Sequence, residues 1–142
     1  MYKNILLSVD LNETASWVKA LPTSIDLAKT YEATLHVVTV VPDFGMAVVG
    51  GFFPADFEEK AMADQKEKLK AFCSKNVPED ITVEAIVRYG HIYEEIIDVA
   101  EEISADLIVM GSHRPELKDY LLGPNAARVM RHANCSVLVV RE

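Results

Sequence analysis

A short segment near the end of the chain has the residue types that bind phosphate. Gly111 and Ser112 directly follow the apolar run 107–110, and a glycine at that point lets a ligand approach the backbone closely. Further along, Gly123 and Pro124 precede a helical pattern whose first-turn amides have no acceptors within the helix. Such amides, together with the helix dipole, form an anion site. The segment therefore suggests a phosphate site, but many helices that begin after a glycine bind nothing, and both interpretations remain open at this point.

Side chains around this segment could add contacts to a bound phosphate. The backbone amides of Asn125 and Ala126 belong to the first turn of the expected helix. The chain has a formal net charge of −8, so a polyphosphate would need positive charge close to it. The basic candidates nearby are His113, Arg114, Lys118 and Arg128.

Asp10 follows the first apolar run, two residues beyond Ser8. Its carboxylate could hold a metal ion beside a phosphate. An aspartate after a strand is also an ordinary turn or helix-capping residue, and both interpretations remain open at this stage.

Familiar catalytic motifs are missing. Ser112 does not stand in Gly-x-Ser-x-Gly, and no Gly-x-x-x-x-Gly-Lys-Ser/Thr is present. We therefore expect no catalytic residue, and slow hydrolysis of a bound polyphosphate at most. The cysteines, Cys73 and Cys135, lack metal-ligand spacing and suggest free thiols, as in the cytoplasm. The acidic charge argues against nucleic acid as a partner, and no apolar run is long enough for a membrane helix.

Five short apolar runs alternate with helical patterns along the 142 residues. This alternation predicts one α/β domain with a parallel sheet and helices on both faces. Ligands of such sheets bind beyond the carboxyl ends of the strands, which here means Asp10, the end of the second run and Gly111. We expect a break at Pro22 in the first helix. The expected strands are 5–9, 34–41, 82–88, 107–110 and 136–140, and the expected helices are 12–31, 57–72, 92–103 and 126–133.

Residues 43–54 fit neither period, being apolar yet rich in glycine. They could form a flap over a site or a surface that a partner buries. A loop that packs on its own domain is an equally good interpretation.

Several motifs together resemble the universal stress protein family. They are Met110-Gly-Ser-His113 after a strand, Leu121-Leu-Gly123 before a helix, the terminal run 135–140 and the opening run 2–10. The resemblance extends in order over essentially the whole chain, and Gly-Ser-His-Arg-Pro-Glu is similar to the short F/G-type bacterial members.

The resemblance implies a five-stranded parallel sheet of order 3-2-1-4-5, in a Rossmann-like, adenine-nucleotide hydrolase-like fold. It further implies a single domain over residues 1–142, a cytoplasmic stress-response protein, and ATP, with or without Mg²⁺, as the ligand. Members of the family pair their last strands, so a homodimer through residues 137–140 is expected, with a tetramer as a larger form.

Residue by residue, the resemblance places Asp10 near the phosphates or a Mg²⁺ ion and Val37 near the adenine. The glycine-containing segment would contact the ribose and the phosphates. The expected nucleotide-binding set is Ser8, Asp10, Val37, Met110, Gly111, Ser112, His113, Arg114, Gly123, Pro124, Asn125 and Ala126.

Two residues depart from the family's ATP-binding pattern. Arg114 stands where a second glycine is expected, and Pro124 replaces a hydroxyl residue. These changes imply altered phosphate contacts. They also keep a second hypothesis open, a dimeric interaction module that does not depend on nucleotide.

Overall fold

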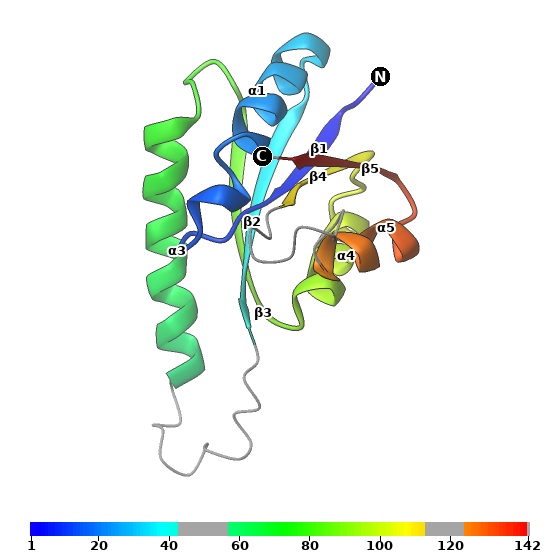
Figure 1. The fold of residues 1–142 in the computed structure, drawn as a ribbon. Helices are drawn as coiled ribbons and strands as arrows, with labels where there is room; N and C mark the ends of the chain where they lie inside the picture. The colour runs from blue at the N-terminus through cyan, green and yellow to red at the C-terminus, as the bar shows by residue number, and fades with distance from the viewer. Residues whose placement is uncertain (43–56, 113–123, 142) are drawn as a thin grey trace.

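The computed structural model describes residues 1–42, 57–112 and 124–141. Their strands form one five-stranded parallel sheet of order β3-β2-β1-β4-β5, as the resemblance implies (Figure 1). The atypical segment 43–54 and residues 113–123 lie outside the described residues. The strands are β1 (Asn4–Ser8), β2 (Thr34–Pro42), β3 (Val83–Gly90), β4 (Leu107–Ser112) and β5 (Ser136–Arg141).

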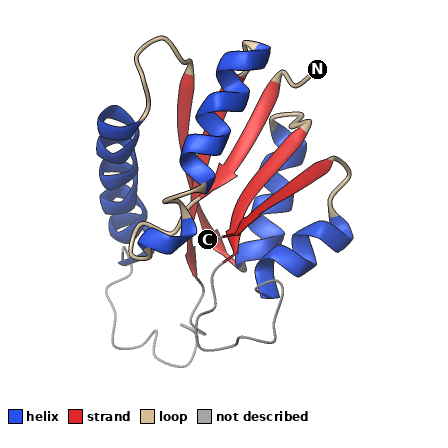
Figure 2. Cartoon of the chain, turned by 45° about the horizontal axis from the view of Figure 1, so that its top comes forward, coloured by secondary structure: helices blue, strands red, loops and turns tan. Residues whose placement is uncertain are grey.

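Helices cover both faces of the sheet (Figure 2). The first core lies between the sheet and helices α1 (Ala20–Tyr31) and α3 (Phe57–Asn76). The second lies between the sheet and helices α4 (Ile92–Glu102) and α5 (Pro124–His132). Because both faces are buried, the central strands are apolar at consecutive positions, which explains the continuous runs in the sequence.

The register brings the ends of the central strands to one edge of the sheet. Ser8 of β1 pairs with Val38 of β2 on one side and with Met110 of β4 on the other. Strand β2 then runs four residues further, to Pro42. Side chains that follow Ser8 and Met110 therefore lie next to each other at the carboxyl edge.

The expected break at Pro22 is wrong, because the interruption comes earlier. A short 3₁₀ turn, η1 (Thr14–Ser16), precedes α1, and Pro22 is the third residue of α1. Amides of the first helical turn need no acceptor within the helix, so a proline is tolerated there. The Trp17 ring, just after η1, packs edge-on against Phe72 of α3 at a centroid distance of 4.9 Å.

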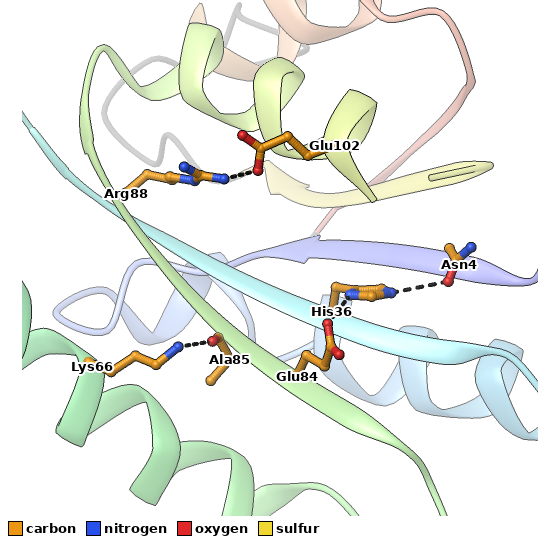
Figure 3. A network of polar contacts seen from close by, with 7 residues as sticks. All are labelled: Asn4, His36, Lys66, Glu84, Ala85, Arg88 and Glu102. Atoms are coloured by element: carbon orange, nitrogen blue, oxygen red, sulfur yellow. Dashed lines mark hydrogen bonds and ion pairs between the residues drawn. The ribbon is translucent and has the colours of Figure 1, made fainter. Parts of the chain in front are cut away.

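Polar contacts tie the edge strand β3 to its neighbours (Figure 3). The Lys66 ammonium of α3 donates to the backbone carbonyl of Ala85, and Arg88 pairs with Glu102 of α4. His36 of β2 is buried, with Nε2 3.2 Å from Asn4 Oδ1 and Nδ1 3.0 Å from Glu84 Oε2. Its position in the core, between two oxygen acceptors, gives it a structural role.

Among the described residues, no helix has the length and apolar character needed to cross a membrane.

Candidate functional site

A cavity of about 750 Å³ lies at the carboxyl edge of the sheet. Its size falls within the range of small-molecule sites. Strands β1, β2 and β4 form its floor, and η1, α3 and α5 contribute to its walls. Its lining residues are Ser8, Val9, Asp10, Asn12, Glu13, Ser16, Thr39, Val40, Val41, Pro42, Ala61, Asp64, Gln65, Ile92, Met110, Gly111, Ser112, Pro124, Asn125 and Ala126.

Most of the predicted nucleotide-binding residues come together in this cavity. Strand β1 brings Ser8 and Asp10, strand β4 brings residues 110–112, and α5 brings residues 124–126. Segments more than 100 residues apart in the sequence thus meet at one edge, as expected for a parallel sheet. His113, Arg114 and Gly123 lie outside the described residues.

Val37 is the exception among the predicted residues that the structure describes. Its side chain is fully buried in the core beneath α1 and α3, and it does not line the cavity. Strand β2 continues to Pro42, so Val37 lies in the middle of the strand and not at its carboxyl end. The β2 residues that reach the cavity are 39–42.

Arg128 also lies away from the cavity. Its guanidinium carbon is 5.2 Å from the centre of the Tyr93 ring, a cation–π contact between α5 and α4. Its positive charge therefore does not contribute to the cavity lining.

The turn after β1 holds Asp10 by several hydrogen bonds. Asp10 Oδ1 accepts the Asn12 amide at 3.0 Å, and the Asp10 amide donates to Ser16 Oγ at 2.9 Å. Asp10 thus has the turn-forming role that the sequence left open. It is also exposed at the cavity, so a second carboxylate oxygen remains available for a ligand.

Gly111 packs against this turn. A Cβ built on Gly111 would lie 2.4 Å from the Ser16 carbonyl oxygen and 2.9 Å from the Ser16 carbonyl carbon. The glycine is therefore required by the chain's own backbone, whatever the cavity binds. The sequence suggests one reason for a glycine at this position, the close approach of a ligand. The packing against Ser16 is a second reason.

Helix α5 begins at the cavity wall. Pro124 is its first residue, as expected from its fixed φ, and Arg131 and His132 lie in its last turn. The amides of Asn125 and Ala126, in the first turn, have no acceptor within the helix. They form the positive end of the helix dipole at the cavity.

Sequence reasoning missed the wall that α3 contributes. Ala61, Asp64 and Gln65 line the cavity although α3 follows β2 by a long connection. Their helical spacing predicts a shared face but does not identify what that face meets. The sequence analysis also missed three cavity residues in the turn after β1: Asn12, Glu13 and Ser16. Their closeness to Asp10 in the sequence was the signal that could have identified them.

The charged residues among the described lining are carboxylates: Asp10, Glu13 and Asp64. Asp64 forms an exposed i,i+4 pair with Lys68 at 3.0 Å, which offsets its charge only weakly. Among the described residues, no group of three potential ligands could hold a metal ion without help. A cation at Asp10 would therefore need further oxygen ligands from a bound phosphate or from water.

The thiols lie outside the cavity lining. Cys73 of α3 is buried, and burial raises its pKa to about 11, with the nearby Lys66 charge acting in the opposite direction. Burial, with a smaller effect of Asp106, also raises the pKa of Cys135. Both groups are poor nucleophiles at neutral pH.

Comparisons with known proteins agree with this fold. The model of the universal stress protein family matches residues 1–141. Universal stress protein G of Escherichia coli O157:H7 is 35% identical over 144 residues, which cover 99% of this chain and 100% of that protein. The likeness to the short F/G-type members is thereby confirmed.

Solved structures give the same result. The hypothetical protein MJ0577 has a TM-score of 0.75 and 28% identity, over 100% of this chain and 97% of the other. The universal stress protein of Archaeoglobus fulgidus, solved in complex with dAMP, has a TM-score of 0.67 and 23% identity over 97% of both chains. The family model, the relatives and the sheet order agree: the chain belongs to the universal stress protein family.

Proposed function

We propose that this chain binds an adenine nucleotide, ATP together with Mg²⁺, in the cavity at the carboxyl edge of the sheet. In this proposal it acts as a single-domain, cytoplasmic stress-response protein, regulatory or protective, and assembles as a homodimer or tetramer. One observation carries the nucleotide assignment. The first turn of α5 opens into a cavity of about 750 Å³ directly beside Gly111 and Ser112.

The α5 end of the cavity suits the phosphates. The amides of Asn125 and Ala126 have no acceptor within the helix, which makes them suitable donors to a bound anion. The Ser112 hydroxyl, at the end of β4, is a further donor on the same side. The base and ribose would then extend toward the half-buried residues 40–42 of β2 and toward Ala61 and Gln65 of α3.

The charges around the cavity support a requirement for Mg²⁺. The charged residues of the described lining are three carboxylates. Residues 113–123 contain one arginine, one lysine, one neutral histidine and two acidic residues, and residues 43–56 contain two acidic residues and no basic one. None of these segments adds net positive charge for a triphosphate. Mg²⁺ is commonly bound by one or two carboxylates and by phosphate oxygens, and Asp10 would be its protein ligand here.

A fold relative supports the choice of base. The Archaeoglobus fulgidus protein was solved in complex with dAMP. At 23% identity that structure supports a common fold, and the assignment to this chain rests on its own cavity.

The test is to purify the protein, denature it and identify released nucleotide by mass spectrometry, then to titrate the emptied protein with ATP by calorimetry. We expect released adenine nucleotide and binding of ATP that weakens at least tenfold when EDTA replaces Mg²⁺. Protein that is purified empty and gives no heat with ATP and Mg²⁺ would refute the proposal.

A nucleotide-independent interaction module is the second candidate, and the carboxylates of the cavity favour it. The variant Ala61→Trp fills the cavity from α3, and Ala63→Trp, at an exposed position on the same helix, is its matched control. If Ala61→Trp abolishes ATP binding and leaves self-association unchanged, assembly does not depend on nucleotide. The main proposal includes no turnover beyond slow hydrolysis, because it assigns Asp10 to Mg²⁺ and not to the activation of water.

A further inference from the structure

The hydroxyl of Ser16 holds the backbone of Asp10 from both sides. Ser16 Oγ accepts the Asp10 amide at 2.9 Å, and it lies 3.1 Å from the Asp10 carbonyl oxygen and 2.8 Å from the Glu13 carbonyl oxygen. Its one proton is within reach of both carbonyls. The backbone on either side of the Asp10 Cα is therefore tied to one side chain six residues away.

The Asp10 carboxylate is fixed by the same turn. Oδ1 accepts the Asn12 amide at 3.0 Å, and the Glu13 amide donates to the Asp10 carbonyl at 3.0 Å. Asp10 is exposed, so packing does little to restrict its side chain. The direction of its carboxylate consequently depends on the shape of this turn, and Ser16 closes the turn.

Ser16 also joins the turn to a second strand. Its carbonyl group lies over Gly111 so closely that a Cβ there would be 2.4 Å from the oxygen. Trp17, the next residue, packs on Phe72 of α3. The end of β1, the end of β4 and helix α3 are thus joined through two consecutive residues.

We propose that Ser16 is a positioning residue of the nucleotide site: its hydroxyl fixes the Asp10 carboxylate at the place where a phosphate-bound cation meets the protein. This inference rests on the proposed function, because it assigns Asp10 a ligand. Ser16 lines the cavity beside Asp10, but its hydroxyl is occupied by the turn and acts through Asp10.

The first test needs no ligand. Amide hydrogen exchange is measured by NMR in the wild type, Ser16→Ala, Ser16→Thr and Thr14→Ala, the last being a control at an exposed hydroxyl of the same turn. The Asn12 amide is the informative probe, because its acceptor is the Asp10 carboxylate and not Ser16. We expect Ser16→Ala to speed its exchange about tenfold, and Ser16→Thr and Thr14→Ala to leave it within about twofold.

The second test measures affinity for ATP with Mg²⁺ in a double-mutant cycle. Ser16→Ala should weaken binding roughly tenfold, and Ser16→Thr should restore it. In an Asp10→Ala background, Ser16→Ala should cause no further loss, because the residue through which it acts is gone. A purely structural role would give additive losses in the cycle.

Unchanged Asn12 exchange in Ser16→Ala, or additive losses in the cycle, would overturn the inference. A wild-type protein that binds no adenine nucleotide would instead refute the proposed function. The exchange of Asn12 would then decide alone whether Ser16 holds the Asp10 carboxylate.

Discussion

The carbonyl group of Ser16 lies directly over Gly111, where any Cβ would be 2.4 Å from its oxygen. Strand β4 ends at this point, and the turn that carries Asp10 rests on its backbone. The sequence connects this glycine with a ligand, but the protein's own backbone already requires it. Its substitution would act on the cavity through Asp10 and not by blocking entry.

Gly111→Ala should therefore weaken both the fold and the site. A contact below 3.0 Å with backbone forces the turn to move, and overpacking of this kind costs about 1–3 kcal/mol in the free energy of unfolding. Urea denaturation measures that loss, and calorimetry should show weaker binding of ATP with Mg²⁺ in the variant. The control is Ser112→Ala, the neighbouring residue, which should leave stability nearly unchanged. A Gly111→Ala protein of wild-type stability would contradict this account of the packing.

Asn125→Asp should change stability and affinity in opposite directions. Asn125 is in the first turn of α5, where a carboxylate interacts favourably with the helix dipole by about 0.3–1 kcal/mol. The same charge would repel a phosphate bound to the amides of that turn, so the affinity for ATP should fall roughly fivefold or more at low ionic strength. Thermal unfolding and calorimetry measure the two effects, with Asn125→Gln as the neutral control. Equal affinity in both variants would mean that no phosphate binds at α5.

Cys73 should make stability depend on alkaline pH. Burial raises its pKa from 9.0 to about 11, so between these values the unfolded chain loses the thiol proton while the folded chain keeps it. The free energy of unfolding should therefore fall as the pH rises through this window, by roughly 2–3 kcal/mol in total.

The measurement compares urea denaturation at pH 8.5 and 10.5 in Cys135→Ala and in the double variant Cys73→Ala/Cys135→Ala. Other alkaline titrations are shared by the two proteins, so the difference between their pH slopes reports Cys73. If the free energy of unfolding has the same pH slope in both proteins, the pKa of Cys73 is the same in the folded and the unfolded chain.

Leu138→Glu should dissociate the proposed homodimer. Strand β5 is an edge of the sheet, and Leu138 is a partly exposed apolar residue at its centre. Pairing of two β5 strands would bring two such glutamates close together, which is unfavourable. Sedimentation equilibrium should give a dimer for the wild type and a monomer for the variant. Met130→Glu, an exposed apolar residue on α5, serves as the control and should remain dimeric.

The strands were predictable because both faces of the sheet are buried. A short apolar run between turn-forming residues, such as 107–110, is typical of a buried strand. The observed strand extends two residues beyond that run, to Ser112. The order of the strands came from the family resemblance, because periodicity does not identify neighbours. The break predicted at Pro22 was wrong because the start of α1 was unknown. The sequence alone does not show whether a proline lies inside a helix or in its first turn.

The candidate site was predictable where it follows a strand end, as at Asp10 and Gly111. It was not predictable where a wall arises from tertiary packing, as at Gln65 of α3. Val37 does not line the cavity, because β2 continues to Pro42 and its later residues reach the edge. The contact between Ser16 and Gly111 joins two segments that are almost 100 residues apart, so no local sequence pattern predicts it.

Lys66 has a consequence for how copies of this chain could assemble. A parallel sheet with two open edges could add a copy at each side and grow into a filament. At the β3 edge the Lys66 ammonium already occupies the carbonyl of Ala85. This contact opposes the addition of a further strand at the β3 edge. A two-fold contact between two β5 strands would cover the β5 edge. Growth by strand pairing would therefore stop at two copies, and the protein could reach high concentration without forming filaments.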